Sequence, residues 1–157
     1  GNINNIRSDM KNTLDALDQH PEVYTVIGES ILGSRINFDN RRVRILRDYP
    51  NSMFFQDFDF SIQAGGYNSF HEVIASSLPS ICYPNLETGR DDQLARTMIA
   101  HKAGCMIVIK DRNQRVIRAA IERIVDPKVR MIMSKNAEIL QRPNGASQIA
   151  DWILDNF

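Results

Sequence analysis

The apolar positions of the chain change from a helical spacing to short continuous runs and back again. The first of them recur every three or four residues and predict an amphipathic helix over residues 4–19: Ile6, Met10, Leu14 and Leu17. Pro21 predicts the end of this helix, because proline disfavours helical backbone at the residue before it. Two β-branched runs follow, separated by a polar stretch, and predict buried strands at residues 23–27 and 43–46.

Strands and helices alternate through the rest of the chain. The predicted elements are a short helix at 52–57, strands at 58–63, 80–83 and 105–109, and helices at 68–77, 92–102 and 113–125. The tail divides at Pro143-Asn144-Gly145 into two helical pieces. Short apolar strands separated by helices are typical of a parallel sheet with helices on both faces. The predicted fold class is therefore α/β with a doubly wound parallel sheet, which binds ligands at the carboxyl ends of its strands.

Length and charge restrict the classes of function. The 157 residues suffice for one domain with a single well-buried core. Nineteen basic and nineteen acidic side chains give a formal net charge of zero, so no overall field attracts nucleic acid or an anionic membrane. No run of about 18 apolar residues and no signal peptide is visible, so we expect a cytoplasmic protein. Cys82 and Cys105 lie within apolar runs, which predicts small core residues rather than a disulfide.

Residues 59–72 carry the pattern of a phosphate-binding turn. A predicted strand ends, Gly65 and Gly66 follow, and a helix begins near Asn68. Glycine allows the backbone to approach a ligand closely, and a helix N-terminus presents unpaired N–H groups and the positive end of its dipole. Glu72, about one turn into the helix, could accept hydrogen bonds from ribose hydroxyls. The same residues also fit a glycine turn before a helix with an ordinary Asn-Ser cap, so both interpretations stay open on chemistry alone.

The segment Gly66-Tyr67-Asn68-Ser69-Phe70-His71-Glu72 resembles the Gly-Trp-Asn-Ser-x-x-Glu core of the UDP-glycosyltransferase signature. It is also similar to the strand-to-helix turn of MurG-type glycosyltransferases. Leu78-Pro79 and Asp92-Gln93 match later parts of the same signature. The resemblance implies a GT-B fold, in which two Rossmann-like domains face each other across a cleft and the C-terminal one binds the nucleotide-sugar donor.

The resemblance also implies a domain organisation. Residues 1–157 would form the nucleotide-sugar-binding domain of a two-domain hexosyltransferase. The first strand and the N-terminal acceptor domain would lie outside this sequence, with Gly1-Asn2 at the end of the turn that follows that strand. The general base belongs, by resemblance, to the N-terminal domain, so no catalytic residue is assigned here. We therefore expect this chain to be inactive alone.

The resemblance assigns roles to individual residues. The implied donor-binding set is Gly65, Gly66, Tyr67, Asn68, Ser69, Glu72, Asp92, Gln93 and Tyr49. Within it, the diphosphate would lie against Gly66 and the start of the helix, the ribose against Glu72, and the sugar against Asp92 and Gln93. Tyr49 stands where the family has an aromatic loop residue against the uracil. The family's His-Cys pair is replaced by Ala64-Gly65, which removes one phosphate contact.

The implied ligand is a nucleotide-sugar, with UDP-sugar as the family default, and neither a metal nor a cofactor is expected. The implied partner is the N-terminal acceptor domain of the same protein, with no nucleic acid. A lipid acceptor would bring peripheral contact with the inner face of the membrane. Two other functions stay open: a nucleotide-sugar 2-epimerase, and the donor-binding subunit of a split glycosyltransferase. An NAD-binding domain fits less well, because no Gly-x-Gly-x-x-Gly follows a first strand.

Three further sequence patterns fit a structural role better than a binding or catalytic role. His71-Glu72 would begin a zinc-binding helix, but Ala75 stands where the second histidine would be required. The basic residues near the helix at 113–125 fit a solvated helix face, or contact with anionic lipid head groups if the acceptor is membrane-bound: Lys110, Arg112, Arg115 and Arg118. Trp152, with Ile149 and Ile153 at helical spacing, predicts an apolar stripe that packs in the core, and in a complete enzyme the same helix could also brace the other domain.

Overall fold

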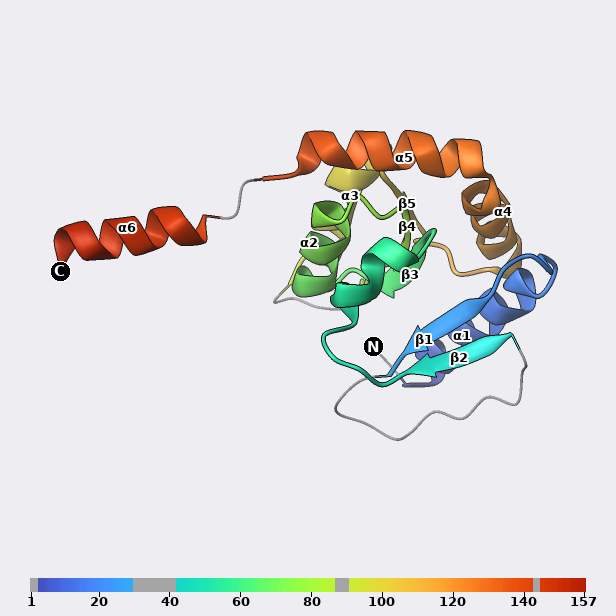
Figure 1. Cartoon of the computed structure of the whole chain (residues 1–157). Coiled ribbons are helices and arrows are strands. Elements are labelled where there is room, and N and C mark those ends of the chain that lie inside the picture. Colours follow the sequence, from blue (N-terminus) through green and yellow to red (C-terminus); the bar gives the residue numbers. More distant parts are fainter. Residues whose placement is uncertain (1–2, 30–41, 87–90, 143–144) are drawn as a thin grey trace.

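A computed structural model of the chain describes residues 3–29, 42–86, 91–142 and 145–157, and side chains from Ser8 onward. In chain order, the elements are α1 (Ile3–Leu17), β1 (Thr25–Gly28), β2 (Val43–Leu46), the 3-10 helix η1 (Asn51–Asp57), β3 (Ser61–Ala64), α2 (Tyr67–Ala75), β4 (Ser80–Tyr83), α3 (Gln93–Lys102), β5 (Met106–Val108), α4 (Gln114–Val125), α5 (Pro127–Leu140) and α6 (Ala146–Asn156) (Figure 1). This order confirms the predicted alternation of strands and helices. The predicted turn at Gly1-Asn2 lies outside the described residues.

The strands form two parallel sheets in the described part of the chain. β1 pairs with β2, and Thr25 lies opposite Val43. The second sheet has the order β3–β4–β5, in which Ile81 lies opposite Ile62 on one side and Ile107 on the other. The predicted parallel α/β arrangement is confirmed, but it is divided, since no described ladder joins β1 to β3.

One strand boundary differs from the prediction. The sequence predicts a strand at 58–63, whereas β3 begins at Ser61. The reason lies in the preceding 3-10 helix η1, which continues to Asp57 and closes with a hydrogen bond from Phe58 N–H to Phe55 O at 3.4 Å. An aromatic run has high strand propensity, but the Phe58 N–H is already bonded to the end of η1 and is not available to a strand ladder.

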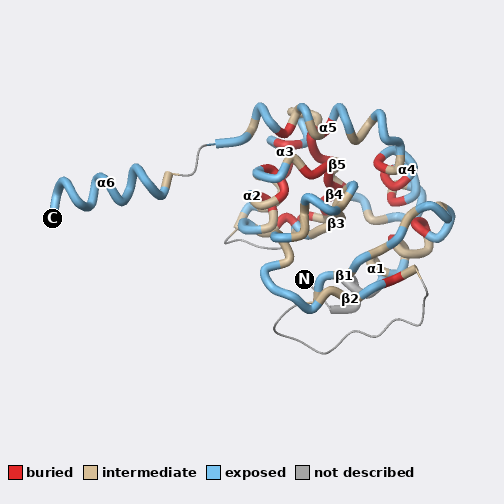
Figure 2. The backbone as a smooth tube through the Cα atoms, viewed as in Figure 1, coloured by how far each residue is buried: buried red, intermediate tan, exposed pale blue. Residues whose placement is uncertain are grey.

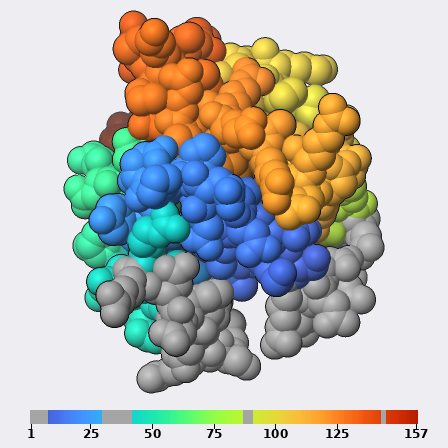
Figure 3. All heavy atoms as spheres, turned by 90° about the vertical axis from the view of Figure 1, so that its right-hand side faces the viewer, coloured from blue at the N-terminus to red at the C-terminus, as the bar shows by residue number. Residues whose placement is uncertain are grey.

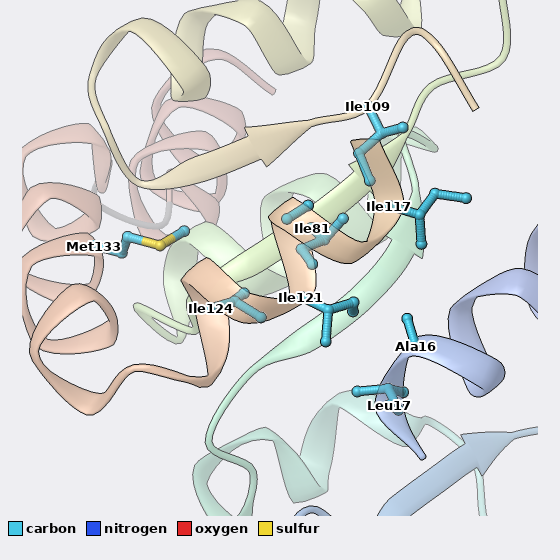
Figure 4. Packing of buried hydrophobic residues seen from close by; sticks show 9 residues of the cluster. Ala16, Leu17, Ile81, Ile109, Ile117, Ile121, Ile124 and Met133 are labelled. Carbon is cyan, nitrogen blue, oxygen red and sulfur yellow. The ribbon is translucent and has the colours of Figure 1, made fainter. Parts of the chain in front are cut away.

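The strand β4 divides the hydrophobic core into two layers. Ile81 lies in a cluster with Ile109, which follows β5, and with residues of α1, α4 and α5: Ala16, Leu17, Ile117, Ala120, Ile121, Ile124 and Met133 (Figure 4). Cys82, the next residue, lies in a cluster with residues of α2, α3, β5 and α5 and of the segments that precede β4 and β5: Phe70, Val73, Ile74, Leu78, Ala100, Cys105, Met106 and Ala137. Because successive strand residues face opposite sides, helices cover both faces of this sheet, as predicted.

Helices pack on both faces of this sheet, and those on one face begin at its carboxyl edge. On one face α1 packs against α4, and the two lie side by side on the surface seen in Figure 3. On the other face α2 and α3 each follow a strand of the central sheet, so their N-termini lie at its carboxyl edge. Figure 2 shows the buried residues concentrated around β4, β5 and the helices that cover them. Both cysteines are buried free thiols, which confirms their prediction as core residues.

The last helix, α6, extends away from the body of the molecule (Figures 1 and 2). None of its residues is buried, and Trp152 is 59% exposed. The prediction that Ile149, Trp152 and Ile153 pack in the core is therefore wrong. Periodicity specifies which face of a helix is apolar, but not which element covers that face.

Candidate functional site

The turn between β3 and α2 packs tightly against two other elements. A Cβ atom on Gly65 would lie 3.0 Å from Thr97 Cγ2 and 3.2 Å from Gln93 Cβ, both on α3. It would also lie 3.3 Å from Cys82 Sγ on β4. These distances are tighter than ordinary van der Waals contacts, so a side chain at this position would require α3 or β4 to shift by a few tenths of an ångström, and packing favours glycine. A Cβ atom on Gly66, in contrast, would meet no atom of the described residues within 4 Å, so the space at this position is open in the described part of the chain.

The first turn of α2 presents backbone N–H groups without a cap. Gly66 is the N-cap, and no side chain accepts a hydrogen bond from this end of the helix. Within the described residues, the amides of Tyr67, Asn68 and Ser69 have no hydrogen-bond partner. The helix begins at Tyr67, so Asn68 and Ser69 lie inside it, and their interpretation as an ordinary cap is wrong. Uncapped amides at the positive end of a helix dipole favour an anion.

Three other helices around the sheet begin with a side-chain cap. Asp92, Asn113 and Asp126 cap α3, α4 and α5, and each accepts a hydrogen bond from a backbone N–H of its own helix. Such a cap stabilises a helix by about 1 kcal/mol. The helix α2 lacks this contribution at the place where the sequence predicts a phosphate.

Glu72 lies about one turn into α2, beside η1. Its Oε1 accepts a hydrogen bond from Ser52 Oγ at 3.2 Å, which joins η1 to α2. Within the described residues this is the one hydrogen bond of the carboxylate, so acceptor capacity remains for a ligand hydroxyl. Ser52 stands three residues after Tyr49, and the contact therefore brings the Tyr49 segment towards α2. The Tyr49 side chain itself is 67% exposed.

Asp92 and Gln93 stand at the N-terminus of α3, next to the glycine turn. The Oδ1 atom of Asp92 accepts a hydrogen bond from Ala95 N–H at 2.8 Å. The Oε1 atom of Gln93 accepts one from Asn85 N–H at 2.9 Å, which holds the start of the loop after β4. Both residues therefore have a structural task, and the Gln93 amide nitrogen is the group left to donate to a sugar hydroxyl. The predicted residues of α2 and α3 meet at one edge of the sheet.

Three polar atoms that the sequence does not single out are buried without a hydrogen-bond partner in the described part of the chain. They are Asn51 Oδ1 in η1, Gln63 Nε2 in β3 and Arg96 Nε in α3. Gln63 and Arg96 belong to elements that lead into the glycine turn or pack against it, whereas the Asn51 amide lies beside Gly28 at the end of β1. Buried polar atoms are nearly always paired, so an unpaired group marks a place where a ligand or water completes the structure. The one sequence signal for Arg96 is its position three residues after Gln93.

Two arginine side chains, Arg96 and Arg112, lie near the carboxyl end of β4. Burial raises the pKa of the Cys82 thiol to about 12, and the guanidinium groups of Arg112 and Arg96 oppose that shift. Both cations therefore lie near this strand end. His71 stacks against Tyr67, with ring centroids 4.4 Å apart, which gives it a structural role on α2. Among the described residues, no group of three or more His, Cys, Asp or Glu side chains is arranged to hold a metal ion.

The fold and this edge define the class of protein. Parallel strands covered on both faces, with a glycine turn leading into an uncapped helix at their carboxyl edge, form a Rossmann-like α/β domain. In the parts of the chain that are described, no helix combines the length and apolar character needed to cross a membrane.

Solved glycosyltransferases share this structure. Spinosyn rhamnosyltransferase SpnG matches with a TM-score of 0.70 and 19% identity, over 94% of this chain and 40% of that chain. SpnG complexed with thymidine diphosphate matches with a TM-score of 0.68 and 18% identity, over 94% of this chain and 40% of that chain. MurG of Acinetobacter baumannii matches with a TM-score of 0.63 and 15% identity, over 72% of this chain and 33% of that chain. No protein-family model and no curated protein matches the sequence.

These similarities concern the fold. The chain has the α/β fold of a GT-B glycosyltransferase domain, which confirms the fold implied by the sequence resemblance. It spans about two fifths of the length of the SpnG chains that it matches.

Proposed function

We propose that this chain binds the nucleoside diphosphate of a nucleotide-sugar donor for glycosyl transfer. The observation that carries the proposal is the open, uncapped N-terminus of α2, where Gly66 leaves space and three amides have no partner in the described residues. Support comes from the Gly-Tyr-Asn-Ser-x-x-Glu segment and from the similarity to SpnG, whose structure with thymidine diphosphate has the same fold.

In this proposal the chain stabilises the leaving group rather than attacking the sugar. Negative charge builds on the diphosphate as the bond to the sugar breaks, and preorganised amides stabilise that charge more than they stabilise the ground state. Glu72 accepts hydrogen bonds from the ribose, and Gln93 with Asp92 binds the sugar. Tyr49 contacts the base. The α2 amides supply the stabilisation that a metal would otherwise give, so binding needs no metal or cofactor.

The acceptor and the general base come from another domain in this proposal. The chain alone binds the donor and shows no turnover. The sequence resemblance implies UDP as the nucleotide, whereas the SpnG complex contains thymidine diphosphate. Both are pyrimidine nucleotides, so the experiment compares them directly.

Calorimetric titration with UDP, TDP, GDP and NAD tests the proposal, using the wild type, Gly66→Ala and Gly145→Ala. A methyl group at residue 66 enters the open space before α2, so we expect it to weaken binding of one pyrimidine diphosphate by about tenfold or more. Gly145 is the matched control, because it is the N-cap of α6 and its nearest neighbour to an added Cβ is 3.9 Å away.

The outcomes separate the functions that the sequence leaves open. A wild type that binds none of the four nucleotides contradicts the proposal, and preference for NAD assigns a dinucleotide domain instead. Equal effects of the two alanine substitutions would show that the α2 terminus is not the site. Conversion of UDP-N-acetylglucosamine without an acceptor would assign a 2-epimerase.

A further inference from the structure

Arg96, in the first turn of α3, contacts the first residue of α2 and the segment that precedes α3. Its side chain is 15% exposed and forms an ion pair with Asp91, the residue before the α3 cap. The guanidinium carbon lies 5.3 Å from the centroid of the Tyr67 ring, on the first residue of α2. Arg96 is thus in contact with α2 and with the segment that leads into α3.

The hydrogen bonding of Arg96 is incomplete. Its Nε atom is buried and has no partner among the described residues. A guanidinium has five N–H donors in a planar fork, which matches the oxygens of a phosphate. Thr97, the next residue, packs against the glycine turn at Gly65, so the backbone of Arg96 lies beside that turn. Ala64 and Gly65 offer no polar side chain of their own to an anion there.

We propose that Arg96 is a diphosphate-binding residue whose guanidinium exchanges Asp91 for the phosphate oxygens of the donor. The inference rests on the proposed function, since it adds a side-chain cation to the α2 amides. Tyr67 holds the guanidinium plane by a cation–π contact, which keeps Arg96 in place while its ionic partner changes. Asp91 then acts as the internal competitor that occupies Arg96 when no donor is bound.

Arg96→Gln and Asp91→Asn test this exchange from opposite sides. The wild type and both variants are titrated with UDP, TDP and inorganic pyrophosphate, and with uridine and thymidine as probes that lack phosphate. Arg96→Gln should weaken binding of the phosphorylated probes by about tenfold or more and leave nucleoside binding unchanged. Asp91→Asn should strengthen binding of the same probes by several-fold, because it removes the competitor.

Arg118→Gln is the matched control, because it removes the same charge from the exposed face of α4. It should leave every affinity unchanged. Arg96→Lys keeps the charge but not the fork, and an intermediate loss would support bidentate binding. Circular dichroism and thermal unfolding identify variants that have lost the fold.

The opposite sign of the two effects separates ligand binding from a structural role. If the ion pair with Asp91 only fixes the loop, both Arg96→Gln and Asp91→Asn weaken binding, and that result overturns the inference. Unchanged affinity of Arg96→Gln beside a wild type that binds UDP or TDP also overturns it, while the proposed function stands. A wild type that binds no phosphorylated probe overturns both.

Discussion

At the scale of single residues, neighbours with similar sequence signals have different tasks. Packing against α3 and β4 favours glycine at residue 65, whereas no described residue would contact a Cβ atom on Gly66. The resemblance implies sugar contacts for Asp92 and Gln93, but Asp92 already accepts a hydrogen bond from Ala95 N–H of α3, and Gln93 accepts one from Asn85 N–H in the loop after β4. The residue types are visible locally, because a glycine pair before a helix is a short-range pattern. The division of tasks depends on atoms of other elements, which no local pattern encodes.

A residue-scale prediction concerns Cys82 and pH. Burial raises the pKa of this thiol from 9.0 to about 12, so between those pH values the unfolded chain loses the proton and the folded chain keeps it. The unfolded state then binds fewer protons, and the free energy of unfolding falls as pH rises, by about 1.4 kcal/mol per unit from this group. Tyr83 and Cys105 have raised pKa values and add in the same direction.

Urea unfolding at about pH 8 and about pH 10 measures this dependence in the wild type and in Cys82→Ala. The variant should lose about 1 kcal/mol less than the wild type between the two conditions, because one linked proton is gone. Equal losses in both proteins would show that Cys82 is not linked to folding. The comparison is insensitive to the cavity left by the truncation, since that cost is the same at both pH values.

At the scale of elements, polar contacts fix α1 against the carboxyl end of β4. Thr13 Oγ1 donates to Asp9 O at 2.7 Å, so it must accept from Tyr83 Oη, 2.8 Å away. Arg112 pairs with the Asp9 carboxylate and donates to Pro84 O at 2.9 Å. The sequence predicts both elements but not this link, because Thr13 and Tyr83 are 70 positions apart.

A double-mutant cycle tests the link between α1 and β4. Thr13→Val leaves the partly buried Tyr83 hydroxyl without its partner, and we expect it to lower the free energy of unfolding by about 1–2 kcal/mol. Tyr83→Phe should cost about 1 kcal/mol. The double variant removes both partners, so its cost should be smaller than the sum of the two single costs, by about 0.5–1 kcal/mol. Strict additivity in urea unfolding would mean that the two hydroxyl groups do not interact.

At the scale of the whole molecule, tertiary packing decides which apolar residues form the core. Ile121 on α4 is 1% exposed, whereas Ile149 on α6 is 62% exposed. Both stand in apolar stripes at helical spacing, so the sequence pattern predicts a buried side chain for each of them. Figure 2 shows the difference, because α4 lies against the central sheet and α6 extends away from it. The division into two parallel sheets is likewise decided at this scale.

The two isoleucines give a prediction for the whole molecule. Ile121→Ala should lower the free energy of unfolding by about 2–5 kcal/mol, through lost apolar burial and the cavity left behind. Ile149→Ala should change it by less than about 0.5 kcal/mol, because its side chain has little to lose. Thermal and urea unfolding of the two variants measure both values. A cost above about 1 kcal/mol at Ile149 would show that α6 packs against the body in solution.

The sequence by itself determined the type and order of the elements, the glycine turn before α2 and the α/β class. Such features come from the apolar period, from proline and glycine, and from turn chemistry, which act over a few neighbouring residues. Only the tertiary structure decided that Ser52 meets Glu72, that Arg96 lies over Tyr67 and that α2 begins uncapped. It also decided that α6 contributes no buried residue to the core. The physical reason is that these contacts join segments distant in sequence, whose meeting depends on how the whole chain packs.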